Sequence, residues 1–180
     1  GVLGILELFN DPEHKVDEKT QKQLLKSAKD SAGNTYELME NLLVWARSQM
    51  NKSNCNPQVN NLSELLRKNI ELKQVTAEQK EIKLIANIPE KLEAYFDLNM
   101  IDTVIRNILS NALKFSYAGG KIEVLAQIYN GEAIVQIADS GIGINEEKIS
   151  KLFDINKEIK RGTGGEKGTG LGLVICKEFI

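Results

Sequence analysis

The stretch KIEVLAQIYNGEAIVQIAD, residues 121–139, predicts two antiparallel β-strands joined by a tight turn. Apolar and polar residues alternate along both halves, which is typical of strands that bury one face. Asn130-Gly131 stands between the halves, and this pair accepts the positive φ angles of a type I′ hairpin turn. The rest of the predicted fold is built outward from this hairpin.

Helices and short strands precede the hairpin. LSELLRKNIELKQVTAEQK predicts a helix, and Asn61 before it forms a capping-box pattern with Glu64. EIKLIANI and EAYFD predict two strands. A further helix begins after Asp97, with these apolar residues on its buried side: Ile101, Val104, Ile105, Ile108, Leu109 and Ala112. The order predicts an α+β fold, with helices on one face of a mixed, mostly antiparallel sheet.

The N-terminal part of the chain has a different pattern. From the end of DPEHK to about Asn51, the sequence predicts a long helix whose apolar residues recur at heptad spacing, with a second apolar row beside the first. Such a wide stripe favours a partial helical hairpin over residues 1–52 that forms a homodimer, and the alternative is a helix packed only on its own domain. The turn-rich NKSNCNPQVN predicts a linker over residues 53–60, followed by a second domain over 61–180.

Composition narrows the possible partners and compartments. The 180 residues carry a formal net charge of −2, with acidic and basic residues interspersed, so we expect no nucleic-acid partner. Cys55 and Cys176 match no metal-ligand spacing, and we interpret them as reduced thiols of a cytoplasmic protein. No apolar run is long enough to span a bilayer, so we expect no direct membrane contact by these residues. The alternative that a longer parent protein is anchored in the inner membrane is compatible with this composition.

A polar stripe interrupts the helix that follows Asp97. At about 100° per residue, Thr103, Asn107, Asn111 and Lys114 share one side of this helix, away from its isoleucines. Amide oxygens can ligate a hard cation such as Mg²⁺, which takes its other ligands from water and phosphate. The stripe therefore predicts a magnesium and phosphate site. The alternative is that the asparagines cap backbone groups or bond to a neighbouring loop.

The motif ADSGIGI ends the second strand of the hairpin. Asp139 is predicted to be a buried hydrogen-bond acceptor, and Gly141 and Gly143 let the backbone approach a flat ligand. A carboxylate accepts from an exocyclic amino group, which favours adenine over guanine. The alternative is a plain connection from a strand to a turn.

The glycine-rich GTGGEKGTGLGL, residues 162–173, opens the last predicted helix. Glycines at a helix start bring bare N–H groups and the positive end of the helix dipole toward an anion, so this segment predicts a phosphate cradle. It matches neither a Walker loop nor a dinucleotide-binding loop, because GxxxxGK[ST] is absent and no strand leads into it. The alternative is a flexible linker.

Taken in chain order, NILSNALKF, DSGIGI, KLF and GTGLGL resemble the N box, first glycine box, F box and second glycine box of the sensor histidine kinases of two-component systems. YELMENLLVWARSQM is also similar to the end of the second helix of their dimerisation domain. The resemblance covers nearly the whole chain. It implies a Bergerat-type ATP-binding fold, a two-layer α/β sandwich, with ATP and Mg²⁺ as cofactors.

The resemblance also implies a role for each motif residue. Asn111 would hold Mg²⁺, Asn107 would help to position the metal and the phosphates, and Lys114 would contact phosphate. The remaining nucleotide-binding positions would be Asp139 at the adenine amino group, Gly141 and Gly143 beside the base, Phe153 in the lid, and Gly168, Thr169, Gly170, Leu171 and Gly172 at the triphosphate.

The reaction implied by the resemblance is transfer of the ATP γ-phosphoryl group to a histidine, and then to an aspartate on a response-regulator receiver domain. The sequence departs from the family pattern at its one histidine, His14, which lies in DPEHKVD and is followed by lysine. In the family, an acidic residue follows the phosphoacceptor. We therefore expect His14 to be a loop residue, the acceptor to precede Gly1, and this fragment to bind ATP without phosphorylating itself.

Two further departures concern the lid and the sheet. KLFDINKEIK contains Phe153 but lacks the second aromatic residue of the family's F box, and the chain stops before the closing strands that the family would place next.

Two rival functions come from other classes of protein. One is an ATPase of the wider GHKL superfamily, which typically has a glutamate base where this chain has Asn107. The other is a non-catalytic dimerising scaffold with a nucleotide pocket.

Overall fold

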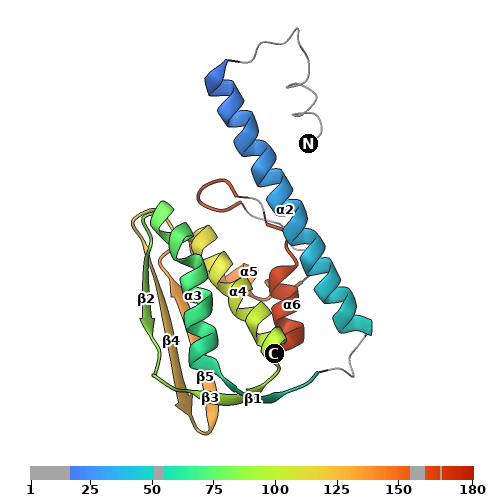
Figure 1. Cartoon of the computed structure of the whole chain (residues 1–180), viewed down its shortest axis with the longest axis vertical. Helices are drawn as coiled ribbons and strands as arrows, with labels where there is room; N and C mark the ends of the chain where they lie inside the picture. Colours follow the sequence, from blue (N-terminus) through green and yellow to red (C-terminus); the bar gives the residue numbers. More distant parts are fainter. Residues whose placement is uncertain (1–16, 51–54, 155–160, 167) are drawn as a thin grey trace.

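The computed structural model describes residues 17–50, 55–154, 161–166 and 168–180. His14 and the first 16 residues of the predicted helical hairpin lie outside these residues. Figure 1 shows a long helix, α2, running beside an α+β domain. In chain order the elements are α2 (Glu18–Met50), β1 (Gln58–Asn61), α3 (Leu62–Gln79), β2 (Lys83–Asn87), β3 (Glu93–Phe96), α4 (Leu98–Phe115), β4 (Lys121–Tyr129), β5 (Glu132–Asp139), α5 (Glu146–Ile149) and α6 (Gly172–Phe179).

The hairpin prediction is confirmed. β4 and β5 pair antiparallel from Ile122 opposite Asp139 to Tyr129 opposite Glu132. Asn130 and Gly131 have φ angles of 52° and 84°, as a type I′ turn requires. β2 lies parallel to β4 on its other side, so this sheet has the order β2-β4-β5 and is mixed, as predicted.

A second, two-stranded sheet was not predicted. β1 pairs antiparallel with β3, with Val59 opposite Tyr95, inside the segment for which the sequence predicts a linker. QVNN contains a single apolar residue, so it has no alternating pattern that could distinguish a strand from a polar turn. The pairing with β3 produces the strand, and the sequence of β1 alone does not.

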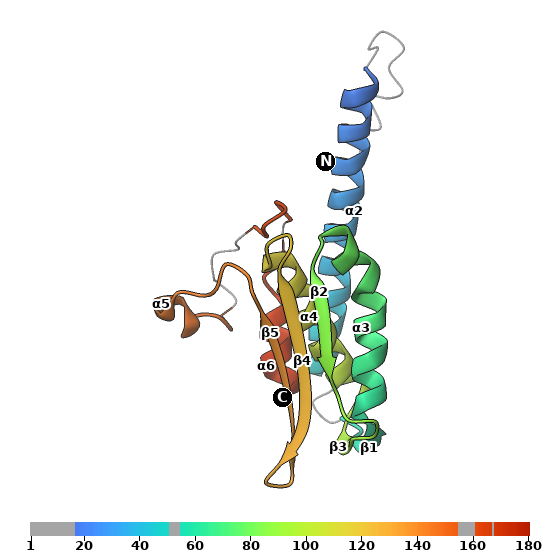
Figure 2. The same ribbon diagram turned by 90° about the vertical axis from the view of Figure 1, so that its left-hand side faces the viewer.

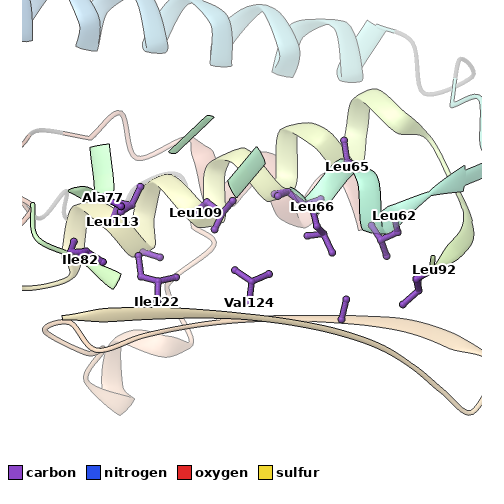
Figure 3. Packing of buried hydrophobic residues seen from close by; sticks show 13 residues of the cluster. Leu62, Leu65, Leu66, Ala77, Ile82, Leu92, Leu109, Leu113, Ile122 and Val124 are labelled. Carbon is purple, nitrogen blue, oxygen red and sulfur yellow. The ribbon is translucent and has the colours of Figure 1, made fainter. Parts of the chain in front are cut away.

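The hydrophobic core lies between the helices and one face of the three-stranded sheet, as Figure 3 shows. Leu66 of α3, Leu109 of α4 and Ile122 of β4 are fully buried there. The alternation along β4 turns Ile122 and Val124 inward and leaves Glu123 between them exposed. The apolar face of α4 thus holds this helix on the sheet and leaves its polar stripe for another contact.

The long helix α2 contacts α6. Four of the residues at heptad spacing differ in burial: Leu24 and Ala28 are partly buried, whereas Leu38 and Leu42 are exposed. Among the described residues, no helix combines the length and the apolar character that a membrane crossing requires.

Asp97 sets the start of α4. Its Oδ1 accepts hydrogen bonds from the amides of Asn99 and Met100, at 3.0 and 3.1 Å, and its Oδ2 accepts from the amide of Asn56 at 2.9 Å. The Asn56 amide first, and then the two helix amides, lower the pKa of the Asp97 carboxyl group against the opposing effect of burial. The ionised side chain therefore caps α4 and ties the preceding segment to it.

Replacing Asp97 by alanine should lower the free energy of unfolding by about 1 kcal/mol at neutral pH, because two helix amides lose their acceptor. Since the pKa of Asp97 is lowered in the folded state, its contribution is present above the ordinary value and is lost as the pH falls through the folded value. Urea unfolding of both proteins over a pH series measures this difference. Asp97→Asn keeps the cap without the charge and is the control; a deficit that stays constant down to strongly acidic pH would contradict the assignment.

Candidate functional site

The polar stripe of α4 faces the glycine-rich segment at the start of α6. A Cβ atom on Gly172 would lie 2.9 Å from Asn107 Oδ1, and a Cβ on Gly168 would collide with Lys114 Nζ. Asn111 lies between Asn107 and Lys114 on the same stripe of the helix. The structure thus brings together two motifs that are far apart in the sequence, and glycine lets the backbone approach the polar side chains.

Thr103, which shares the stripe by helical spacing, does not join the site. Its side chain is buried, and its hydroxyl donates a 2.8 Å hydrogen bond to the carbonyl of Asn99 one turn earlier. A threonine inside a helix commonly forms this bond to its own backbone, which helical spacing alone cannot reveal.

The start of α6 has the features of an anion site. Its first amides have no carbonyl partner within the helix, and the helix dipole adds a partial positive charge there. Gly170 has a φ angle of +76°, which permits the turn into the helix, and the amide of Leu171 donates to Thr169 Oγ1 at 3.4 Å. These amides lie next to Asn107, because Gly172 is the first residue of α6.

The other glycine motif lies at the C-terminal end of α4. Asp139 Oδ1 accepts a 2.9 Å hydrogen bond from the amide of Gly141, and a Cβ on Gly141 would collide with the carbonyl oxygen of Phe115. Gly143 has a φ angle of +65°. Only glycine fits comfortably at these two positions, for two different reasons: close approach at Gly141 and left-handed backbone at Gly143.

The prediction that Asp139 is a buried acceptor is wrong. The residue is exposed at the end of β5, which among the described strands pairs only with β4. Its Oδ1 is engaged by Gly141, so the exposed carboxylate retains acceptor capacity at Oδ2. The motif is therefore open to solvent.

The last carbonyl groups of α4 hold both glycine motifs. The carbonyl of Phe115 accepts from the amide of Ile142 at 3.2 Å, and the carbonyl of Lys114 accepts from the amide of Thr163 at 3.0 Å. The Thr163 hydroxyl also donates to the carbonyl of Ser116 at 2.6 Å. Helix ends leave such carbonyls without intrahelical donors, and here the two loops supply them. Thr163 was not predicted as a site residue, since a lone threonine in a glycine-rich loop gives no sequence signal.

Phe153, the predicted lid residue, lies outside the hydrophobic core with 40% of its surface exposed. It follows α5, which Figure 2 shows projecting away from the sheet. The structure therefore does not bring Phe153 into the group formed by the α4 stripe and the start of α6.

The donor set of the site suits a magnesium–phosphate ligand better than a protein-only metal centre. Among the described residues, no three His, Cys, Asp or Glu side chains lie close enough to hold a metal ion. The α4 stripe offers neutral amide oxygens from Asn107 and Asn111, with the ammonium group of Lys114 nearby. Mg²⁺ is commonly held by few protein ligands, with water and substrate phosphates completing its shell. The residues present fit such an ion.

Comparison with known protein families agrees with this geometry. The family model described as "Histidine kinase-, DNA gyrase B-, and HSP90-like ATPase" matches residues 96–180. The sensor histidine kinase TmoS of Ectopseudomonas mendocina is 38% identical over 106 residues, which are 58% of this chain and 11% of TmoS. The sensor protein SrrB of Staphylococcus aureus is 30% identical over 161 residues, which are 88% of this chain and 27% of SrrB. The chain thus spans about a quarter or less of these curated relatives.

The solved structures that resemble this chain include histidine kinases. The nucleotide-free catalytic domain of the histidine kinase ThkA is 29% identical, with a TM-score of 0.62 over 69% of this chain and 80% of that chain. ThkA in complex with the response regulator protein TrrA has a TM-score of 0.75 over 99% of this chain and 49% of that chain. Its identity of 21% supports likeness of fold alone.

Proposed function

Because the chain carries the ATP-binding catalytic domain of a two-component sensor histidine kinase, we propose that it binds Mg-ATP across α4 and directs the γ-phosphoryl group to a histidine. The observation that carries this proposal is the contact of the α4 stripe with the glycine-rich segment. Gly172 abuts the side-chain amide of Asn107 and Gly168 abuts the ammonium group of Lys114. A phosphate at the start of α6 would therefore meet backbone amide donors and the ammonium group of Lys114, beside amide oxygens that can ligate its Mg²⁺.

Each residue then has a distinct task. Asn111 and Asn107 supply amide oxygens for Mg²⁺ and its water shell, and Lys114 neutralises phosphate charge. Asp139 accepts from the adenine amino group, with Gly141 beside the base. Gly143 and the residues of the second glycine motif complete the proposed nucleotide contacts: Gly168, Thr169, Gly170, Leu171 and Gly172. Phe153 lies apart from these residues, and its proposed place is in the lid.

This arrangement favours phosphoryl transfer over ATP hydrolysis. An asparagine such as Asn107 cannot act as a general base, so the site offers no carboxylate on the α4 stripe that could activate a water molecule. What the site offers is positioning and charge neutralisation, which are the main needs of phosphoryl transfer. Bound Mg²⁺ would supply the remaining neutralisation of the phosphate oxygens.

We further propose that the phosphoryl group passes from the histidine to an aspartate on a response-regulator receiver domain. The structure of ThkA with TrrA, which shares this chain's fold, shows that such a kinase binds a response regulator. A homodimer formed through α2 is part of the same proposal, and the exposed Leu38 and Leu42 on that helix support it. His14 is not the acceptor in this scheme, because lysine follows it.

The test supplies the acceptor separately. The chain is incubated with Mg²⁺ and ATP labelled on the γ-phosphate, together with a helical hairpin that carries a histidine followed by an acidic residue. We expect label on the hairpin that is labile in acid and stable in alkali, as phosphohistidine is, and none on the chain or on its His14→Ala variant. Release of labelled phosphate without transfer would favour the ATPase alternative, and absence of nucleotide binding would favour the scaffold.

A further inference from the structure

One ion pair connects the end of α3 with the loop before the second glycine motif. Lys80 follows α3, and its Nζ lies 2.6 Å from Glu166 Oε1. The same ammonium group donates to the carbonyl of Leu113 at 2.9 Å and lies 3.4 Å from Thr163 Oγ1. We call Lys80, Thr163 and Glu166 the loop clasp. The Lys80 side chain is 22% exposed, whereas both partners of the ion pair between Lys121 and Glu123 are about half exposed.

Glu166 also organises its own loop. Its Oε2 accepts from the amide of Gly164 at 2.9 Å, and its carbonyl accepts from the amide of Gly162 at 2.8 Å. Gly162 packs tightly on α4, since a Cβ there would lie 2.5 Å from Lys114 Cγ. The clasp therefore fixes the loop against the turn of α4 that carries Lys114.

The charge state of Glu166 agrees with this contact. Burial alone would raise the pKa of its carboxyl group. The hydrogen bond from Lys80, the positive charge of Lys80 and backbone donors, including the Gly164 amide, outweigh burial and leave the pKa below its ordinary value. Glu166 is thus ionised at neutral pH and Lys80 keeps its partner.

We propose that Lys80 and Glu166 are positioning residues, which hold residues 162–166 on α4 so that the segment 168–172 begins in place to receive the phosphates. This inference rests on the proposed function. Gly168 lies two residues beyond Glu166 and abuts Lys114, so the clasp and the proposed phosphate contact share one turn of α4. Without the clasp, nucleotide binding must also order the loop. The apparent affinity is then the intrinsic affinity multiplied by the fraction of molecules whose loop is already in place.

The clasp predicts an effect on phosphate binding and none on base binding. Asp139 accepts from the amide of Gly141, and the amide of Ile142 ties this motif to the carbonyl of Phe115. Within the described part of the chain, neither Lys80 nor Glu166 forms a hydrogen bond with Asp139 or Gly141. We therefore expect Lys80→Met and Glu166→Ala to weaken binding of a non-hydrolysable ATP analogue with Mg²⁺ by roughly 3- to 10-fold, since an ordering cost is added to binding. Affinity for adenosine, which has no phosphates, should not change.

The experiment measures both affinities by calorimetry for the 180-residue chain and its variants. Glu123→Ala, in the exposed pair with Lys121, is the matched control and should bind both ligands like the wild type. Hydrogen exchange gives a second measure, because the amides of Thr163 and Gly164 should exchange faster in Glu166→Ala before nucleotide is added. Lys80→Arg, which keeps a cation at the helix end, should restore most of the affinity for the ATP analogue.

Each outcome either supports or overturns the positioning role of Lys80 and Glu166. Loss of ATP affinity with unchanged adenosine affinity supports the clasp as a positioning device. Equal loss for both ligands, or a loss that follows the melting temperature alone, would show that Lys80 only stabilises the fold and would overturn the inference. Variants that bind like the wild type would overturn it as well. If the wild type itself binds no ATP analogue, the proposed function fails, which is a different outcome from unchanged variants of a binding wild type.

Discussion

Replacing Asp139 by asparagine is expected to lower the affinity for an ATP analogue by roughly 10- to 100-fold, the loss typical of a hydrogen bond to a charged group. The side-chain oxygen of the introduced asparagine can still accept from the amide of Gly141, as Oδ1 of Asp139 does at 2.9 Å. Its other group becomes an NH₂ donor, which would face the amino group of adenine. Two donors then meet, and neither is satisfied.

The same replacement should shift the base preference. Guanine presents a carbonyl oxygen where adenine presents its amino group, so an asparagine donor suits guanine better. Calorimetric titration with ATP and GTP analogues measures both affinities. Asp30→Asn, on the exposed side of α2, is the matched control and should leave both unchanged. An Asp139→Asn protein that binds the ATP analogue like the wild type would remove Asp139 from the site.

The second large effect is expected for Asn111→Ala. The loss of the amide proposed to ligate Mg²⁺ should abolish the strengthening of nucleotide binding by the metal and should slow phosphoryl transfer by roughly 100-fold or more, because Mg²⁺ neutralises phosphate oxygens. Binding without Mg²⁺ should be nearly unchanged. Titration with and without the metal, and transfer of label to a histidine hairpin, measure the two parts separately.

Asn99→Ala is the control for Asn111→Ala. Asn99 lies in the first turn of the same helix, its side chain is exposed, and its hydrogen bonds with Asp97 and Thr103 use its backbone atoms. It should therefore change neither Mg²⁺ dependence nor transfer. If Asn111→Ala kept its Mg²⁺ dependence, the metal would have to be held by other oxygens, and the magnesium assignment on α4 would be wrong.

The parts of the fold that the sequence predicts are those in which the local pattern and the tertiary contacts agree. Asn130-Gly131 between two alternating runs specifies the hairpin, and Asp97 followed by a strongly amphipathic run specifies α4. β1 was missed, because its four residues become a strand only through β3. The exposure of Asp139 could not be predicted either, since it depends on which strands flank β5.

The sequence predicts the individual motifs of the candidate site, but it does not predict the contacts between them. Spacing places Asn107, Asn111 and Lys114 on one stripe, but the pairing of Asn107 with Gly172 depends on how α6 packs on α4. The two charged clasp residues lie in ordinary sequence contexts: Lys80 at a polar helix end and Glu166 between Gly165 and Lys167. Charged residues at such positions are usually solvated, so only the three-dimensional contact distinguishes them.

The parallel pairing of β2 with β4 has a consequence for how the protein folds. Lys83 lies opposite Lys121, and the chain between them contains β3 and the whole of α4. β2 can therefore pair with β4 only after the long chain segment between them has been ordered. This makes the pairing slow compared with formation of the β4–β5 hairpin. The helix that carries Asn107, Asn111 and Lys114 is part of that segment. During refolding, the β4–β5 hairpin should therefore form early, whereas nucleotide binding should appear only in the final, slow phase.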